Sequence, residues 1–265
     1  MNKISLDSPL ARGRTADVFD WEDGQVLKLF HNWFPLENIQ FEQRIARAVH
    51  ASGVSAPDVI GDIIQVEGRN GLIYERVDGR SMLELLPLQP WKVFSFAKRF
   101  ARLHVQMHER VFKAEVATQR SKLEYRLQHI EALATSLRAA LVERLASLPD
   151  DERICHGDFH PANVLVTPKR DAVIDWMDAS RGNPLADVAR TTIILLGAVE
   201  SGQISNPLMK TFVKIFHTAY LKEYFHLRPG REDEYRRWLP IVAAARLSEE
   251  IKEIESWLVQ QARSL

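Results

Sequence analysis

The chain has 265 residues, of which 46% are hydrophobic and 26% charged, a composition typical of a globular protein with one large or two small domains. Thirty-five Lys and Arg residues balance thirty-five Asp and Glu residues, so net charge favours neither nucleic acid nor an anionic membrane as a partner. The single cysteine excludes an internal disulfide framework and no apolar segment has the length of a signal peptide or a membrane span, which predicts a cytoplasmic protein.

The N-terminal part of the chain has the pattern of two strands followed by a helix. Apolar β-forming residues at 18–21 and 25–30 flank Glu22-Asp-Gly24, a sequence typical of a hairpin turn. Apolar residues then recur at helical spacing over 36–52, with a proline before and a glycine after, as helix ends prefer. We therefore predict a hairpin and then one helix.

A second pair of strands follows the helix. The patterns at 59–66 and 72–77 predict two strands, joined by a loop over 67–71. Residues 75–79 then have the character of a hinge, because a turn signal, Asp78-Gly79, ends the strand-rich part of the chain.

The rest of the chain is mostly helical. A helix beginning at Pro90 has its apolar residues on one side, and a leucine-rich stripe predicts a continuous helix over 119–148. Three more helices are predicted over 184–201, 207–225 and 231–262. One hairpin interrupts the helices, with strands at 164–167 and 172–174 and a turn at 168–171.

These elements predict an α+β protein with two lobes. A small β-rich N-terminal lobe with one helix covers residues 1–77, and a larger, mainly α-helical lobe covers residues 78–265. The hinge at 75–79 joins them.

Three polar residues lie around the middle hairpin. Asp158 and Asn163 precede its first strand on one loop, and Asp175 ends its second strand. The return of the hairpin predicts that Asp175 comes beside Asn163. Phosphoryl transfer requires a carboxylate that orients and deprotonates a hydroxyl, and oxygen ligands that hold Mg²⁺ against nucleotide phosphates. This set therefore fits a kinase reaction.

The stretch His156-Gly-Asp-Phe-His-Pro-Ala-Asn163, followed by Val173-Ile-Asp-Trp176, resembles the aminoglycoside and choline phosphotransferase family, relatives of protein kinases with the same two-lobed fold. The motifs occur in the family order from Gly13 to Asp187. The resemblance implies that Asp158 is the catalytic base and that Asn163 and Asp175 hold Mg²⁺.

The resemblance also implies a nucleotide site in the N-terminal lobe. Lys28 stands where the family places the lysine that contacts the α- and β-phosphates. Glu42 matches its partner glutamate, and Glu37 is a second candidate. The non-functional alternatives are that Lys28 faces solvent from its strand and that Glu42 is a solvated residue of its helix.

Two backbone segments complete the expected nucleotide site. The loop containing Gly13, Thr15 and Ala16 precedes a strand, and its N–H groups could donate to phosphate oxygens, although an ordinary turn would have the same sequence. Backbone groups from Glu75 to Val77 would contact the base. The expected cofactors are ATP and Mg²⁺, with GTP left open.

Several further polar residues have expected supporting roles. By the resemblance, Asp187 braces the catalytic loop, with charge at a helix N-terminus as the alternative. His156 is expected to support loop geometry, and His160 lies nearer the substrate. His104 and His108 lack a third ligand of convincing spacing, so no metal site is predicted there. The single cysteine, Cys155, is expected to be buried and inert.

The acceptor is expected to be a small alcohol. Only eleven residues separate Asp175 from Asp187, which leaves no room for the activation segment of a protein kinase. Residues 185–265 contain eleven Lys or Arg and ten Asp or Glu residues, so no acidic surplus indicates a polycationic acceptor. Aminoglycosides, sugars, amino alcohols and hydroxy amino acids all remain open.

Two further alternatives concern the acidic residues and the activity. Glu249, Glu250, Glu253 and Glu255 cluster and either line the acceptor site or form a solvated face. A nucleotide-binding regulator without turnover is the alternative function, although the complete Asp158, Asn163 and Asp175 set favours an enzyme. Neither nucleic acid nor membrane is expected as a partner, and the oligomeric state stays open.

Overall fold

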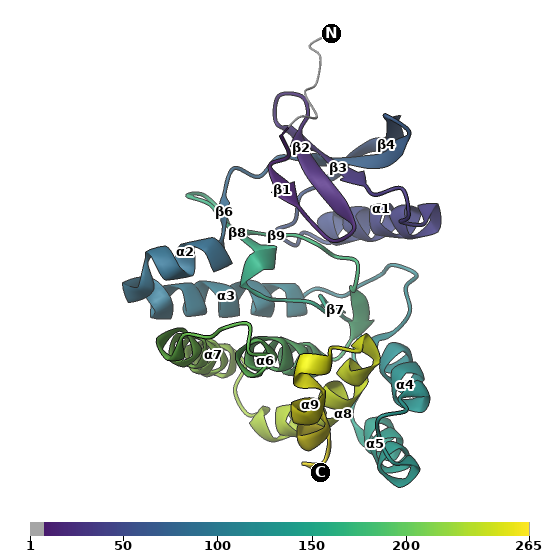
Figure 1. Ribbon diagram of the computed structural model, residues 1–265, viewed down its shortest axis with the longest axis vertical. Coiled ribbons are helices and arrows are strands. Elements are labelled where there is room, and N and C mark those ends of the chain that lie inside the picture. The colour runs from purple at the N-terminus through teal and green to yellow at the C-terminus, as the bar shows by residue number, and fades with distance from the viewer. Residues whose placement is uncertain (1–7, 265) are drawn as a thin grey trace. The chain divides into compact units, whose positions relative to one another are not determined.

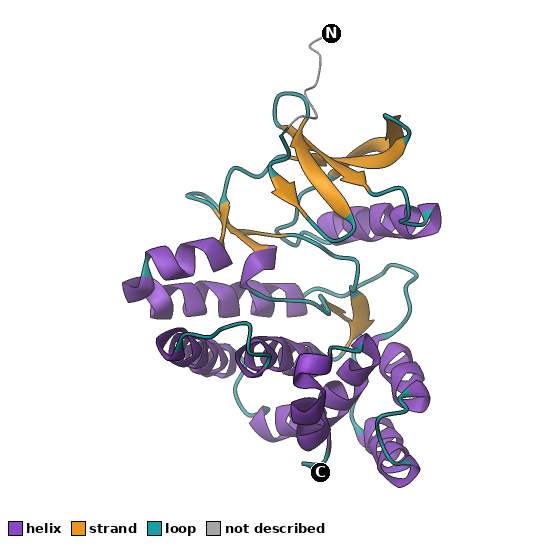
Figure 2. Ribbon diagram, viewed as in Figure 1, coloured by secondary structure: helices purple, strands orange, loops and turns teal. Residues whose placement is uncertain are grey.

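The structure of the protein, a computed structural model, describes residues 8–264. The chain divides into two compact units, Met1–Arg80 with Leu165–Met177, and Ser81–Val164 with Asp178–Leu265. Across residues 8–264, the helices are too short or too polar to span a bilayer. Figure 2 shows that strands dominate the first unit and helices the second.

The first unit is built on a five-stranded antiparallel sheet with the order β1-β2-β3-β5-β4 (Figure 1). Its strands are β1 Ala11–Arg12, β2 Ala16–Asp20, β3 Gln25–Phe30, β4 Val59–Val66 and β5 Arg69–Glu75. The helix α1, Leu36–Ala51, lies where the sequence predicts it. The predicted hairpin is also confirmed, because Gly24 has φ +75° in the turn between β2 and β3.

The loop predicted over 67–71 is too long. Glu67 and Gly68 alone form the turn, with φ values of 49° and 76°, and β5 begins at Arg69. The predicted loop contains Gly71, but this glycine lies inside the strand. A Cβ atom there would lie 2.7 Å from Leu27 Cδ1, so a larger residue would have to displace this buried side chain, and the glycine serves close packing and not a turn.

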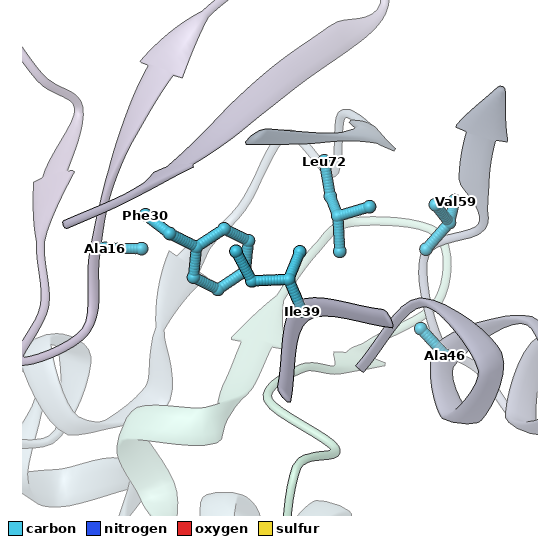
Figure 3. Close-up of a cluster of buried hydrophobic side chains, with 6 residues drawn as sticks. All are labelled: Ala16, Phe30, Ile39, Ala46, Val59 and Leu72. Atoms are coloured by element: carbon cyan, nitrogen blue, oxygen red, sulfur yellow. The ribbon is translucent and has the colours of Figure 1, made fainter. Parts of the chain in front are cut away.

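A hydrophobic core lies between this sheet and α1 (Figure 3). Figure 3 shows Phe30 of the sheet directed toward Ile39 of the helix, and Leu72 and Val59 pointing to the same side. All of these side chains are at least 96% buried. Each large one contributes about 1.5–3 kcal/mol relative to an exposed position, which fixes α1 against the sheet.

The second unit is mainly helical. Its helices are α2 Met82–Leu88, α3 Val93–His108, α4 Gln119–His129, α5 Thr135–Ser147, α6 Pro184–Glu200, α7 Pro207–Leu227, α8 Glu232–Arg246 and α9 Glu255–Ala262. Two short strands, β7 Arg153–Cys155 and β10 Ser180–Gly182, pair antiparallel. The strands β6 Arg80–Ser81, β8 Val164–Val166 and β9 Ala172–Val173 follow one another in a third sheet in the order β6-β8-β9, and β9 belongs to the first unit. The strands β8 and β9 form the hairpin predicted from the sequence.

The helices α3 and α7 run parallel and in register. Contacts recur between residues 116 positions apart, as His104 with Tyr220 and His108 with Tyr224 show. Phe100 also packs on Phe159 with a ring separation of 4.1 Å, so α3 supports the loop that carries Asp158. The loop therefore packs through Phe159 on the helix pair formed by α3 and α7.

The single helix predicted over 119–148 is wrong, because the structure has two helices there. Ile130 leaves the helical region with φ −79° and ψ 118°, and α4 ends at His129. Arg138 from α5 donates to the carbonyl of Ile130 at 3.0 Å, which satisfies a helix end without glycine or proline. The leucine-rich stripe continues through the break, because Ile130 and Leu133 stay buried.

The continuous helix predicted over 231–262 is also wrong. The helix α8 ends at Arg246, and Glu250 has the left-handed φ value of 53° before α9 begins at Glu255. The irregular segment between them buries Ile254, and a Cβ atom on Gly197 of α6 would lie 3.3 Å from Ile254 Cδ1. The break therefore allows Ile254 to be buried against Gly197 of α6.

Candidate active site

Lys28 and Glu42 form a buried ion pair in the first unit. Lys28 lies on β3 and Glu42 on α1, and Lys28 Nζ is 2.7 Å from Glu42 Oε1. Asp175 Oδ1 lies 3.7 Å from the same nitrogen. Glu42 is only 3% exposed, whereas Glu37 lies on the exposed face of α1. The helix therefore places one glutamate, Glu42, against the lysine.

A tyrosine completes this group. Tyr74 of β5 donates its hydroxyl hydrogen to the same Oε1 of Glu42 at 2.7 Å, while Glu42 Oε2 is buried without a hydrogen-bond partner among the described residues. Burial would lower the pKa of Lys28, but the charges of Glu42 and Asp175 raise it above its ordinary value. Burial, and then Glu42, raise the pKa of Tyr74 well above its usual range. Lys28 is therefore a fixed cation at neutral pH.

Asp175 follows β9 and departs from extended backbone geometry. Its φ value is 64°, in the left-handed region. The next residue, Trp176, is buried and donates from Nε1 to the carbonyl of Val173 at 3.0 Å. This turn anchors the chain and leaves the Asp175 side chain 49% exposed, with its carboxylate directed to Lys28 and available to a ligand.

Asp158 and Asn163 lie on one loop of the second unit. Asn163 Nδ2 donates to the backbone carbonyl of Asp158 at 2.9 Å, which leaves the amide oxygen as a possible metal ligand. His160 Nε2 lies 3.3 Å from Asp158 Oδ2. Burial would raise the pKa of Asp158, but His160, with the charges of Arg190 and His156, lowers it to about 2. Asp158 is therefore ionised at neutral pH.

Asp187 binds the backbone at the start of this loop. Its carboxylate accepts hydrogen bonds from the backbone N–H groups of His156 at 2.7 Å and Gly157 at 2.8 Å. It also accepts from Nε2 of His104 at 3.1 Å and of His108 at 3.2 Å. Burial would raise the pKa of Asp187, but the two histidines hold it well below its usual range. Asp187 stands in the first turn of α6, so the helix-terminus alternative also applies.

The two histidines are satisfied on both ring nitrogens. Tyr220 and Tyr224 lie 2.7 and 2.8 Å from Nδ1 of His104 and His108, respectively. The neutral tautomer with hydrogen on Nε2 satisfies every polar atom of the group, because each tyrosine then donates to Nδ1. Burial lowers the pKa of His108 to about 3, and the charge of His104 contributes in the same direction. The expectation that the two histidines lack a third potential ligand is wrong, because Asp187 brings a carboxylate oxygen to them and the three ligand atoms lie within 4.8 Å of one another. In this structure the ring nitrogens are engaged in hydrogen bonds with Asp187 and the two tyrosines.

Two residues of α6 that sequence reasoning missed also fix the loop. Arg190 Nε donates to the carbonyl of Gly157 at 3.0 Å, and Thr191 Oγ1 donates to the carbonyl of Phe159 at 2.9 Å. Gly157 has φ +78°, and a Cβ atom there would lie 2.6 Å from the carbonyl oxygen of Asp178. The sequence did contain a signal for these two residues. Arg190 and Thr191 lie three and four positions after Asp187, so all three share one face of a helix, and Asp187 was already expected to contact the loop.

The backbone segments expected at the nucleotide have partly occupied hydrogen-bonding groups. Gly13 N–H donates to Ala16 O at 2.9 Å, which closes a turn between β1 and β2. The carbonyl of Thr15 accepts from His31 N–H at 2.9 Å. In the hinge, Glu75 N–H donates to the carbonyl of Asp58, and Val77 O accepts from a neighbouring amide.

Cys155 precedes the catalytic loop and is fully buried. Burial raises the pKa of its thiol well above the usual range, with the nearby charge of Asp187 adding to this effect. The expectation that Cys155 is buried is therefore confirmed, and the raised pKa favours the unreactive thiol form.

Similarity searches among solved structures show the fold. A thermostable mutant of aminoglycoside phosphotransferase APH(4)-Ia is 16% identical, with a TM-score of 0.65 over 99% of this chain and 96% of that one. The amicoumacin kinase hAmiN is 15% identical, with a TM-score of 0.62 over 96% and 85% of the two chains. An aminoglycoside-3'-phosphotransferase of type VIII is 19% identical, with a TM-score of 0.60 over 94% and 93%. The predicted two-lobed, kinase-like α+β class is confirmed.

Sequence comparison identifies the family. The acyl-CoA dehydrogenase family member 11 of Gallus gallus is 23% identical over 208 residues, which are 66% of this chain. The match spans only 27% of that longer protein. The model of the phosphotransferase enzyme family, APH, matches residues 8–239. Because this match covers most of the chain and confirms the resemblance seen in the motifs, the protein belongs to the phosphotransferase enzyme family.

Proposed function

We propose that the protein transfers the γ-phosphoryl group of ATP to a hydroxyl group of a small molecule, with Mg²⁺ as the metal. The observation that carries this proposal is the group formed by Lys28, Glu42 and Asp175. Lys28 Nζ lies 2.7 Å from Glu42 and 3.7 Å from Asp175, so a fixed cation lies beside a half-exposed carboxylate. A lysine held in this way suits phosphate oxygens, and the carboxylate suits a hard cation.

The donor set fits Mg²⁺. Asp175 offers a carboxylate and Asn163 an amide oxygen that is free of the hydrogen bond made by its nitrogen, and Mg²⁺ prefers oxygen ligands. Held by Asn163 and Asp175, Mg²⁺ would neutralise charge on the nucleotide phosphates. Lys28 would bind the α- and β-phosphates.

Asp158 would orient the acceptor hydroxyl. Its pKa of about 2 keeps it ionised, so both oxygens can accept a hydrogen bond from the hydroxyl, but makes it a weak base at neutral pH. Phosphoryl transfer proceeds through a loose transition state in most analyses, so positioning the hydroxyl matters more than removing its proton early. The proton would pass to Asp158 as the new phosphate ester forms, while Asp187 and Arg190 keep the loop in place.

The nucleotide is proposed to be ATP, with GTP as the alternative. A related APH(4)-Ia mutant structure is a ternary complex with AMP-PNP and hygromycin B, and the hAmiN structure contains AMP-PNP and Ca²⁺. In the hinge, the N–H groups of Glu75 and Arg76 already donate to carbonyls, which makes Val77 N–H the candidate donor to the base. The turn from Gly13 to Ala16 would cover the phosphates.

The first test is nucleotide binding. At a concentration of Mg-ATP about 100 times its Kd, the free energy of unfolding should rise by about 2.7 kcal/mol. Lys28→Ala should remove most of this gain, whereas Arg44→Ala, an exposed position on the same helix as Glu42, should keep it. No stabilisation of the unchanged protein would contradict the kinase proposal.

The second test is turnover. ATP consumption would be measured with aminoglycosides, sugars, amino alcohols, hydroxy acids and hydroxy amino acids as acceptors. Asp158→Asn should lower kcat by about 10²–10⁴-fold while Mg-ATP still stabilises the protein. Mg-ATP binding without turnover of any acceptor would favour the alternative, a nucleotide-binding regulator.

A further inference from the structure

Three arginines converge on one glutamate beside the catalytic loop. Arg126 lies on α4, Arg190 on α6 and Arg246 at the end of α8. Glu249 Oε1 is 2.6 Å from Arg190 Nη2 and 3.8 Å from Arg126 Nη1, and its Oε2 is 3.8 Å from Arg246 Nη1. Only the contact with Arg190 is short, so one carboxylate does not balance three guanidinium groups.

Arg246 has the least satisfied side chain of the three. It is only 12% exposed, and its Nε and Nη1 atoms are buried without a hydrogen-bond partner among the described residues. Burial lowers the pKa of Arg246 to about 10, and the positive charge of Arg190 contributes in the same direction, while the negative charges of Glu249 and Asp158 oppose the shift. The nearest carboxylate oxygen, on Glu249, is 3.8 Å away, so a ligand that brings a closer negative charge would stabilise this buried cation.

Arg126 is also available. Its shortest ion-pair distances are 3.8 Å to Glu249 and 3.9 Å to Asp178, both too long for a hydrogen bond. Lys122, one turn before it on α4, donates instead to the carbonyls of Asp178 and Ala179 at 3.2 and 3.1 Å. The guanidinium of Arg126 therefore has donors to offer to a ligand, whereas Lys122 is committed to the protein.

This cluster adjoins the proposed catalytic residue. Arg190 donates to Gly157 O, and its charge helps to lower the pKa of Asp158. A pocket of about 50 Å³ is lined by Arg126 and Lys122 of α4, Arg190 and Asp187 of α6, the last turns of α8 up to Ala245, and the loop residues Gly157 and Asp178. Arg246 follows the lining residue Ala245 in the chain and is not itself part of the lining. The pocket volume holds about three to five water molecules, at ~10–15 Å³ each, or a group the size of a carboxylate or phosphate.

The acidic residues near the C-terminus do not offset the arginines. Glu250, Glu253 and Glu255 are exposed, which fits the solvated-face alternative for three of the four predicted acids. Glu249 alone turns inward, and its Oε1 forms an ion pair with Arg190 at 2.6 Å without a well-directed hydrogen bond among the described residues. A polycationic acceptor would therefore meet the positive charges of Arg126 and Arg246 on approaching Asp158, and the carboxylate that lies among the arginines, Glu249, is already paired with Arg190.

We propose that the acceptor is an alcohol that carries an anionic group, a carboxylate or a phosphate ester, bound by Arg126 and Arg246 while its hydroxyl meets Asp158. This inference rests on the proposed function and names its substrate class. The acceptor oxygen forms a bond to the γ-phosphorus as the bond to the bridging oxygen of ADP breaks. The hydroxyl proton passes to Asp158 and then to solvent. The arginines contact only the anionic group and bind it by charge-assisted hydrogen bonds.

The test uses a matched set of three-carbon probes. Glycerol, D-glycerate, glycerol 3-phosphate and 3-aminopropane-1,2-diol share a backbone but differ in charge. Binding would be followed by the shift in unfolding temperature, with Mg²⁺ and AMP-PNP saturating so that the nucleotide site is filled, and at one ionic strength. We expect D-glycerate, glycerol 3-phosphate or both to stabilise the protein, and the neutral and cationic probes to have no effect. The two anions distinguish a carboxylate site from a phosphate site.

Variants then locate the effect. Arg246→Gln and Arg126→Gln should each weaken anion binding by about tenfold or more, whereas Arg236→Gln, exposed on the same helix as Arg246, should leave it unchanged. Glu249→Gln should keep or strengthen anion binding, because it removes the resident carboxylate. If the site instead binds a cation, the cationic probe should bind more weakly to Glu249→Gln and more strongly to Arg246→Gln.

The outcomes separate the two proposals. Loss of Mg-ATP stabilisation in the unchanged protein would reject the kinase itself. If Mg-ATP binds but the anions fail to stabilise, or stabilise the Arg246→Gln and unchanged proteins equally, the anionic acceptor is rejected and the kinase stands. Turnover confined to neutral or cationic alcohols would reject it as well. Anion binding that disappears in Arg246→Gln and persists in Arg236→Gln supports it, whether or not these small probes are turned over.

Discussion

Glu42 in the first unit and Asp187 in the second are both buried carboxylates, but they differ in how many of their oxygens are used. Glu42 receives Lys28 and Tyr74 on Oε1, and its Oε2 lacks a partner among the described residues. Asp187 accepts two ring N–H and two backbone N–H groups, distributed over both oxygens. Its histidine partners are in turn bonded to tyrosines.

The difference separates a site that binds ligands from one that maintains structure. Lys28 is shared between Glu42 and Asp175, and Asp175 is half exposed, so a ligand can enter this group and reorder its charges. The side chains of Asp187, both histidines and both tyrosines are fully buried, and their polar atoms are engaged in hydrogen bonds with one another or with the loop. We therefore expect substitutions around Glu42 to affect nucleotide binding first, and substitutions around Asp187 to affect folding first.

The largest effect is expected for Asp187→Ala. This change removes the acceptor of four buried donors, and breaking such a charged network costs about 3–5 kcal/mol of folding free energy. Urea unfolding followed by circular dichroism would measure it. A loss below about 1 kcal/mol would remove the distinction between the two carboxylates.

The next effect concerns pH and His108. Its pKa is lowered from 6.5 to about 3 by burial and by the charge of His104, with Asp187 opposing and Arg228 adding to the shift. Between these two values the unfolded chain binds a proton that the folded chain does not, so the free energy of unfolding rises with pH. Between the two pKa values this residue contributes a slope of at most about 1.4 kcal/mol per pH unit. The stabilisation is fully present above pH 6.5 and is lost as the pH falls toward 3.

His108→Gln isolates this contribution. Glutamine can still donate to Asp187 but does not titrate, so the number of protons taken up on unfolding between pH 4 and 5.5 should fall by about one. His104, and His217, whose pKa burial lowers to about 4, should supply the remaining slope. An unchanged proton number would show that His108 is not the buried neutral histidine described above.

The smallest effect is expected from a matched pair of tyrosine substitutions. Tyr224→Phe leaves His108 Nδ1 buried without its donor and should cost about 1–3 kcal/mol, with little change in the Kd for Mg-ATP. Tyr74→Phe leaves Glu42 paired with Lys28, so it should cost only about 1 kcal/mol but change the Kd for Mg-ATP a fewfold. Equal effects of the two variants on both measurements would contradict the comparison.

Local signals predicted most of the fold. Glu22-Asp-Gly24 predicted the first hairpin, and proline before and glycine after residues 36–52 predicted α1 within one residue of its end. The two continuous helices predicted over 119–148 and 231–262 were wrong because no proline or glycine marks either break. Arg138, from the next helix, satisfies one end, and burial of Ile254 decides the other, so both depend on contacts that the local pattern does not contain.

The site shows the same limit. The spacing within His156 to Asn163 identified the loop, and the position of Lys28 in its strand led to Glu42. Tyr220 and Tyr224 were missed because their role depends on the parallel register of α3 and α7, more than a hundred residues apart in sequence. Arg246 was missed because a lone arginine at a helix end carries no pattern until burial and its neighbours are known.

The left-handed backbone of Asp175 restricts which substitutions can be interpreted there. Among residues with a side chain, aspartate and asparagine enter this conformation at the lowest cost, so the position accepts few residues even before its charge is considered. Asp175→Asn preserves the backbone and removes only the charge, whereas Asp175→Ala adds about 1 kcal/mol or more of conformational strain. The backbone thus filters the sequence variation this position tolerates, and an asparagine there in a related chain would indicate a lost charge without a changed turn.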